Sequence, residues 1–206
     1  MGTLFFFDRL VLTGRRSKRN LNACLVHRSL GKTYLGAGGE MTGISAHGTV
    51  IIHCAPRALL AHIEWTVGRT MGQPVTFDWK PRKGVPGYFR AESDWQAPLE
   101  LGAALASDMR GWASVLFEVT QHSSDSTEGY RWSYTPTLGM FCGQTDRFGN
   151  VLLSEQRIAV IMQNCGANGV ELQRALREAL GESWDAELEP YRLDSWDEPQ
   201  RLRSIG

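Results

Sequence analysis

Cysteine is scarce in this sequence, and its spacing does not mark a metal or redox site. The four cysteines include no C-x-x-C pair and no cysteine–histidine zinc pattern. Two disulfides would be expected only in an exported protein. The N-terminal segment does not have the order of an export signal, because its basic residues follow the apolar run instead of preceding it. We therefore expect reduced thiols, no metal site and a cytoplasmic location.

The motifs that mark common catalytic and cofactor sites are also absent. The chain contains no Walker loop, no G-x-G-x-x-G, no G-x-S-x-G and no H-E-x-x-H. A domain without an evident nucleophile, metal set or cofactor loop more often binds than catalyses. We therefore expect no cofactor and favour a binding protein over an enzyme.

The chain as a whole lacks a net charge, but its charges are unevenly distributed along the sequence. Residues 1–40 contain seven basic and two acidic groups, a net charge of +5. This leaves 15 basic and 20 acidic groups, a net charge of −5, in residues 41–206. A domain of that charge has no broad electrostatic attraction for nucleic acid. We therefore expect no nucleic-acid partner.

Residues 1–40 are predicted to be an N-terminal extension that is not part of the domain. The apolar run from Leu4 to Leu12 is broken by Asp8-Arg9 and is far shorter than the ~20 residues that span a bilayer. The segment is either an amphipathic anchor at a membrane surface or a translated upstream extension that ends before Met41. We predict one domain over residues 41–191, followed by a tail over residues 192–206.

The hydrophobic pattern between residues 49 and 119 predicts an α+β fold. A β-branched run predicts a buried strand, apolar residues at helical spacing predict helices, and alternation predicts half-buried strands. The predicted elements are strand 49–54, a helix from Pro56 to Gly72, strands 74–80 and 88–95, a helix from Pro98 to Met109, and strand 115–119. This is the order of a ferredoxin-like split β-α-β-β-α-β core. We expect mixed strand directions, strand 49–54 in the centre and both helices on one face.

Further strands and helices are predicted to follow this core. Two strand-like stretches cover residues 130–134 and 138–143. Ser154 and Asn168 each have the position of an N-cap before an apolar helical pattern. From Glu182 onward the chain is rich in acids, and its aromatic residues Trp184 and Tyr191 are candidate docking anchors.

The junction between the first strand and the first helix is a candidate anion site. The start of a helix carries free backbone N–H groups and a partial positive charge, and Arg57 stands beside it. With His53 and Asp78 it would form a ligand site for a carboxylate or phosphate. Alternatively, Arg57 pairs with Glu64 or Asp78 and only stabilises the junction.

A second candidate is a surface that binds a protein partner. His62, Trp65 and Arg69 share one side of the predicted helix, apart from its apolar stripe. Tryptophan and arginine are common anchors of interfaces, and Trp184 is a further candidate in the acidic tail. The alternative is a mixed surface on which the tryptophan covers the edge of the sheet.

Seven segments of the chain carry recognisable motifs: residues 53–59, 62–65, 75–79, 110–112, 117–120, 134–141 and 184–191. Over about residues 42–191 they resemble an actinobacterial family of unknown function, DUF3145. The resemblance implies a link with fatty-acid metabolism, since genes of that pathway neighbour those of the family. It implies no activity, cofactor or catalytic residue.

Three functions remain open from the sequence. We expect first an uncharacterised cytoplasmic regulatory or protein-binding module. The second is a binding protein for an anionic metabolite such as an acyl-CoA. The third is an enzyme of unknown reaction that uses His53, Arg57 and Asp78.

We predict that residues 1–40 are dispensable for folding. A chain that begins at Met41 should keep the thermal midpoint of the full chain to within a few degrees, because the predicted core lies beyond that residue. Calorimetry of the two chains measures the difference. Insoluble material from the shorter chain would mean that the apolar run from Leu4 to Leu12 completes the core.

Overall fold

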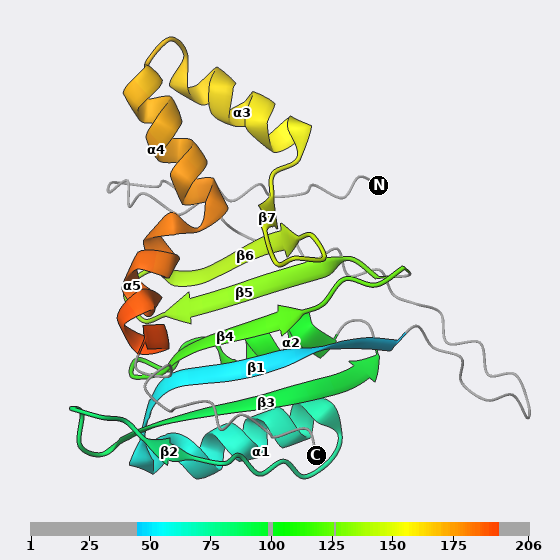
Figure 1. Cartoon of the computed structure of the whole chain (residues 1–206), viewed down its shortest axis with the longest axis vertical. Helices are drawn as coiled ribbons and strands as arrows, with labels where there is room; N and C mark the ends of the chain where they lie inside the picture. The colour runs from blue at the N-terminus through cyan, green and yellow to red at the C-terminus, as the bar shows by residue number, and fades with distance from the viewer. Residues whose placement is uncertain (1–44, 99–100, 126, 194–206) are drawn as a thin grey trace, which may run out of the picture.

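A seven-stranded antiparallel sheet forms the centre of the protein (Figure 1). The computed structural model describes residues 45–98, 101–125 and 127–193, so the predicted extension 1–40 lies outside the described residues. The strands in chain order are β1 (Ser45–Pro56), β2 (Lys80–Pro81), β3 (Tyr88–Pro98), β4 (Leu116–Gln121), β5 (Gly129–Thr135), β6 (Gly139–Thr145) and β7 (Val151–Leu152). Their order across the sheet is β2-β3-β1-β4-β5-β6-β7.

The α+β class is confirmed, and β1 has the inner position predicted for it. The expectation of mixed strand directions is wrong, because every neighbouring pair of these strands is antiparallel. The strands β4 to β7 follow one another through short connections, which reverse the chain at each step. The finer assignment to a ferredoxin-like topology stays a prediction.

The predicted strand 74–80 is largely wrong, because only Lys80 and Pro81 pair with β3. The segment before them still buries Phe77, which is 5% exposed. Its polar groups are held by helix α1 instead of a strand. The carboxylate oxygen Oε1 of Glu64 accepts hydrogen bonds from the backbone N–H of Phe77 at 3.0 Å and from Nε1 of Trp79 at 2.9 Å.

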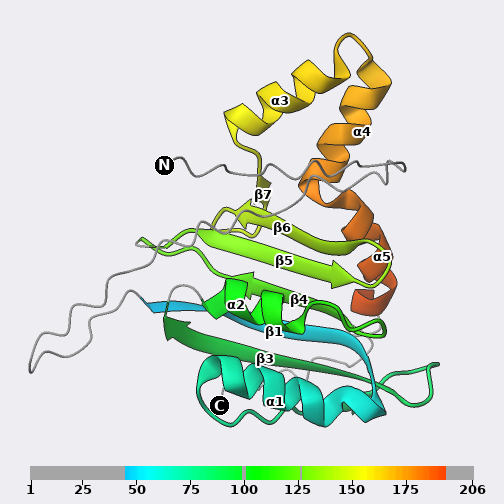
Figure 2. The same cartoon turned by 180° about the vertical axis from the view of Figure 1, so that it is seen from behind.

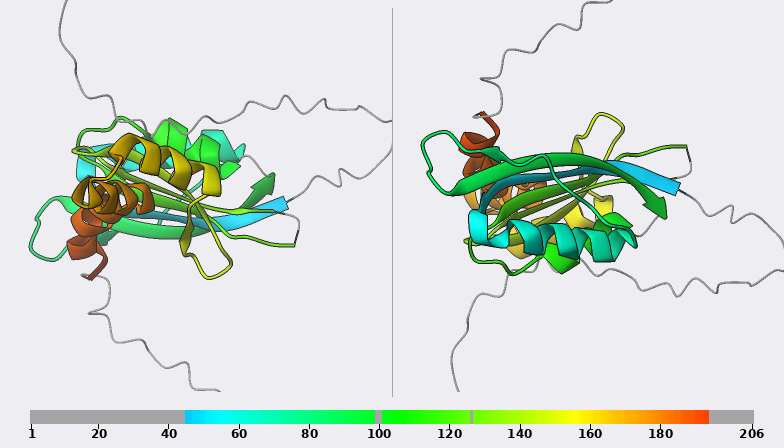
Figure 3. Two further views of the ribbon diagram at one scale, coloured as in Figure 1. Left: turned by 90° about the horizontal axis from the view of Figure 1, so that it is seen from above. Right: turned by 90° about the horizontal axis from the view of Figure 1, so that it is seen from below.

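Two helices cover one face of the sheet, as predicted (Figure 3). They are α1 (Leu60–Met71), preceded by a 3-10 turn (Arg57–Leu59), and α2 (Leu101–Met109). Helix α1 ends at Gly72, which has a φ of 70° that favours glycine. Ile63 and Val67 of α1 and Leu105 of α2 are fully buried between the helices and the sheet.

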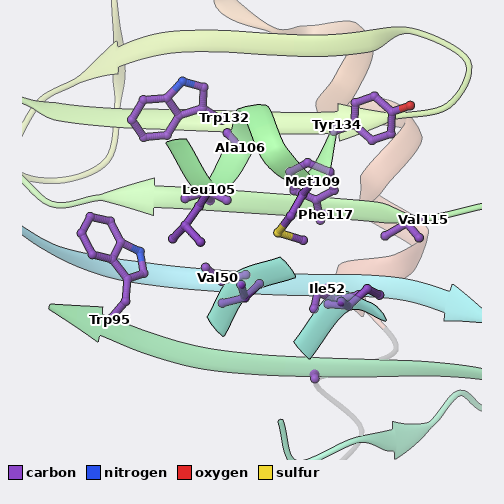
Figure 4. Close-up of a cluster of buried hydrophobic side chains, with 14 of the residues drawn as sticks. Val50, Ile52, Trp95, Leu105, Ala106, Met109, Val115, Phe117, Trp132 and Tyr134 are labelled. Atoms are coloured by element: carbon purple, nitrogen blue, oxygen red, sulfur yellow. The ribbon is translucent and has the colours of Figure 1, made fainter. Parts of the chain in front are cut away.

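The main core lies between these helices and strands β1, β3, β4 and β5 (Figure 4). Its side chains come from alternate positions of each strand, because alternate side chains of a strand point to the same face of the sheet. Each large apolar side chain contributes about 1.5–3 kcal/mol when it is fully buried. The labelled members are Val50, Ile52, Trp95, Leu105, Ala106, Met109, Val115, Phe117, Trp132 and Tyr134.

The opposite face of the sheet carries helix α5 (Glu182–Leu193), which the sequence did not predict (Figures 2 and 3). Leu188 of this helix is fully buried against Cys54 and Leu116. The helix ends two residues beyond the predicted domain boundary at 191.

Helices α3 (Glu155–Cys165) and α4 (Gly169–Leu180) lie between β7 and α5 in the chain. Both predicted caps are confirmed: Ser154 Oγ accepts from the N–H of Arg157, and Asn168 Oδ1 accepts from the N–H groups of Val170 and Glu171. None of the helices in the described ranges is long and apolar enough to cross a bilayer.

We predict that Glu64 stabilises the fold by holding the segment 74–79. Glu64→Ala should lower the free energy of unfolding by about 1–3 kcal/mol, because both hydrogen bonds are lost from a partly exposed charged acceptor. Glu64→Gln keeps an acceptor oxygen and should lose less than half as much. Urea unfolding measures both variants. Equal losses would show that the acceptor oxygen does not hold the segment.

Candidate functional site

The outer side of α1 presents three of the four residues predicted to contact a partner. His62, Trp65 and Arg69 are exposed, while Ile63 and Val67 on the other side are buried. The separation follows from helical spacing, since residues three and four apart share a side. We call His62, Trp65 and Arg69 the α1 surface.

Trp65 is held in place although 63% of it is exposed. The guanidinium carbon of Arg69 lies 5.0 Å from the centroid of its ring, a cation–π distance. Arg69 is fixed in turn by Asp108 of α2, at 3.2 Å between Nη2 and Oδ2. The hydroxyl of Thr70 donates to the same carboxylate oxygen at 2.7 Å. Two helices therefore orient one exposed tryptophan.

A hollow of about 630 Å³ adjoins this tryptophan. It lies where the C-terminal half of α1 meets the following segment, and its lining is mixed in polarity. The lining residues are Ala61, Glu64, Trp65, Gly68, Arg69, Gly72, Gln73, Pro74 and Val75. Glu64 and Arg69 place one negative and one positive charge at the rim, and each already has a partner.

The residues of the predicted anion site are not brought together. His53 is buried, with Nε2 2.8 Å from Oε2 of Glu118. Arg57 is exposed at the 3-10 turn, with its guanidinium carbon 5.7 Å from the ring centroid of Phe89. Asp78 lies at a separate small hollow of about 130 Å³ near β2 and β3.

Two local features explain this separation. Alternation along β1 puts His53 on the face opposite to the core residue Ile52, which is the face that α5 covers and not the face of α1. The N–H of Arg57 already donates to the carbonyl of Gly87 at 2.9 Å. The alternative in which Arg57 pairs with Glu64 or Asp78 is not found either, since no ion pair joins these side chains in the described residues.

Trp184 is a core residue, so the prediction that it contacts a partner is wrong. It is 0% exposed, and its ring centroid lies 5.3 Å from that of Phe141. Its indole N–H donates to the carbonyl oxygen of Gly139 at 3.0 Å. The acidic stretch after Glu182 forms a helix that lies on the sheet, and the side chain of Trp184 faces inward from it.

A buried carboxylate under α5 is the main polar feature that the sequence did not predict. Glu118 of β4 is 5% exposed. Its oxygens accept from Nε2 of His53 at 2.8 Å and from the hydroxyl of Ser133 at 2.9 Å. They also accept from Nε and Nη2 of Arg192 at 3.0 and 2.6 Å. Four donors therefore satisfy its four lone-pair positions.

The charges extend from Glu118 along α5. Arg192 Nη2 also donates to Asp185 at 2.9 Å, and Asp185 pairs with Arg131 of β5 at 3.1 Å. Burial alone would raise the pKa of Glu118, but the hydrogen bonds from His53 and Arg192 outweigh it and hold the pKa well below its ordinary value. The carboxylate is therefore ionised and paired, which suits a structural role better than proton transfer.

Chemistry based on metal or thiol finds little support on this face. Among the described residues, no group of three or more histidine, cysteine or acidic side chains is placed to hold a metal ion. Burial raises the pKa of the Cys54 thiol, which disfavours the reactive thiolate.

Comparison with known families agrees with the resemblance seen in the sequence. A family described as a protein of unknown function (DUF3145) matches residues 49–203 of the 206-residue chain. The chain belongs to this family. The matched stretch of DUF3145 takes in α5 and its network. No curated protein and no solved structure matches the chain.

We predict that Glu118 makes the stability of this DUF3145 protein depend on pH in acid. Its pKa is lower in the folded chain than the value of about 4.3 expected when unfolded. It therefore contributes stability above that value, and the contribution is lost as the pH falls. In thermal midpoints measured from about pH 7 to pH 3, the native chain should fall more steeply than Glu118→Gln once the pH drops below about 4.3.

Glu92 provides the control, because its side chain is 56% exposed and its carboxylate pairs only weakly, with 3.8 Å between Oε2 and Nη2 of Arg90. Glu92→Gln should follow the native curve throughout. Parallel curves for Glu118→Gln and the native chain would contradict the role assigned to the buried carboxylate.

Proposed function

We propose that this protein is a cytoplasmic protein-binding module that recruits a partner through the α1 surface. The observation that carries the proposal is the orientation of Trp65 by Arg69 and Asp108 while most of its ring is exposed. An isolated exposed apolar residue needs no explanation, but an exposed tryptophan stacked with an arginine has the composition of an interface hot spot.

The arginines of this region favour a partner with carboxylates. Arg57 and Arg69 balance Glu64 and Asp108, so this surface is neutral in a domain whose net charge is −5, and it repels an acidic segment less than the rest of the domain does. Arg57 stands about 12 Å before Trp65 along the helical segment. A peptide segment with one large apolar side chain and flanking carboxylates would cover Trp65 and reach both arginines.

The other functions have less support from the geometry. A site for an acyl-CoA or another anionic metabolite needed His53, Arg57 and Asp78 to converge, and they lie at three separate places. An enzyme that used His53 as a catalytic group would first have to break the hydrogen bond between His53 and Glu118. A regulatory role, with a partner in fatty-acid metabolism, remains within the proposal.

We predict that Trp65 is required for binding acidic peptides. Selection of a random displayed peptide library on the full chain should enrich sequences with an aromatic or aliphatic residue beside Asp or Glu. Their affinity for Trp65→Ala should be at least ~30-fold weaker, the effect of losing a hot-spot side chain of about 2 kcal/mol. The thermal midpoint should stay unchanged, because the ring is mostly exposed.

Val85→Ala is the matched control, since Val85 is a second exposed apolar residue, 37% exposed, outside the α1 surface. It should bind the selected peptides like the native chain. Peptides that bind Trp65→Ala as tightly as the native chain would contradict the proposal.

A further inference from the structure

Helices α3 and α4 form an arm, residues 154–181, that projects from the β7 side of the sheet (Figures 1 and 2). The main contacts of α3 are with α4, and those of α4 are with α3 and α5. Helix α3 has no buried residue, and α4 buries only Ala179. The arm therefore lacks the apolar cover that a helix of a globular protein normally has.

Exposed apolar side chains gather in and next to this arm. In the described part of the chain, nine large hydrophobic residues are exposed, and seven of them lie between residues 148 and 180. These seven are Phe148, Leu152, Ile158, Val160, Met162, Val170 and Leu180. Such a concentration in one region marks an interaction surface.

Five apolar residues of the arm form two stripes. Ile158 and Met162 are four residues apart on α3, and Leu172, Leu176 and Leu180 follow at the same spacing on α4. The inner sides of the two helices are separate from these stripes, because they line a hollow of about 550 Å³ in which Arg157 and Arg174 lie beside Val160. Helical spacing puts the leucine stripe on the side of α4 opposite Arg174. We call the two stripes together the arm face.

We propose that the arm face is covered by the arm face of a second copy of this chain, so that four helices pack around a two-fold axis. Two-helix hairpins with one open apolar side complete their core in this way. The inference is independent of the proposed function.

The spacing of the leucines is self-complementary. If two α4 helices pack antiparallel with the axis at Leu176, Leu172 of one copy faces Leu180 of the other. The same contact then occurs twice, as a two-fold interface requires. No charged residue lies within either stripe.

Charge and size also favour a second copy. The arm carries three acidic and three basic residues, so two arms do not repel each other, and no sign of charge selects a different partner. Two helices of about 17 Å length and ~10 Å width present roughly 340 Å² in projection, and more when the relief of the side chains is included. Counted on both copies, this is roughly 680 Å² before the relief of the side chains is added, which is the size of a weak, dissociating dimer.

The dimer would leave the α1 surface accessible on both copies. The arm and α1 lie at opposite ends of the molecule (Figure 1). A dimer would therefore present two α1 surfaces, and a partner with two acidic segments would bind by avidity.

Sedimentation equilibrium of the full chain tests the proposal. Between about 1 and about 100 µM the native chain should show twice the mass of one chain, with dissociation on dilution. Met162→Asp and Leu180→Asp should each weaken dimerisation at least ~100-fold, because every dimer would bury two unpaired carboxylates. Circular dichroism should show unchanged helix content in both variants.

Val170→Asp is the matched control. Val170 is 77% exposed on α4 but lies outside the leucine stripe, so this variant should dimerise like the native chain. A native chain that is monomeric over the whole range would overturn the proposal. So would a Val170→Asp variant that dissociates as strongly as Leu180→Asp.

The register has a separate test by mixing two variants. Leu172→Glu and Leu180→Lys should each be monomeric alone. An equimolar mixture should form a heterodimer, because the glutamate introduced in one copy would face the lysine introduced in the other. A mixture that stays monomeric would overturn the antiparallel register about Leu176.

Discussion

The buried carboxylate of Glu118 organises the side of the sheet that carries α5. An unpaired ionised carboxylate at this depth would be strongly destabilising, so its four donors are part of the fold and not an addition to it. Arg192 supplies two of these donors from the last turn of α5. The carboxylate therefore fixes the end of α5, and α5 continues directly from α4. Trp184 anchors the start of α5, next to the arm, against Phe141 and Gly139. The position of the arm therefore depends on both ends of α5.

The two faces of the sheet are stabilised in different ways. The α1 and α2 face is an apolar core in which Phe117 and Val119 of β4 point toward the helices. The α5 face combines the small Leu188 cluster with the charges of Glu118, Arg192, Asp185 and Arg131. Because the inner side of α1 supplies the apolar contacts with the sheet, its outer side is free to present Trp65. The charged face holds α5 and, through it, the arm. The two surfaces proposed for binding are thus supported by separate halves of the fold.

Elements with strong local signals could be predicted from the sequence, and those set by distant partners could not. The helix that ends at Gly72 and the caps at Ser154 and Asn168 depend on neighbouring residues, so their patterns were sufficient. Residues 74–79 alternate like a strand, but Glu64 satisfies their polar groups from a helix. Helix α5 contains Pro190 and many acids, which obscured its pattern. The signal for Glu118 was an acid between Phe117 and Val119 in an apolar strand, but only the folded chain brings Arg192 to it.

A double-mutant cycle on Glu118 and Arg192 tests most directly whether this pair holds α5 on the sheet. The free energy of unfolding in urea would be measured for Glu118→Gln, Arg192→Leu, the double variant and the native chain. The sum of the two single losses should exceed the loss of the double variant by about 1.5 kcal/mol or more. The reason is that removing one partner leaves the other buried and unpaired. Losses that add to within about 0.5 kcal/mol would contradict the role assigned to the pair.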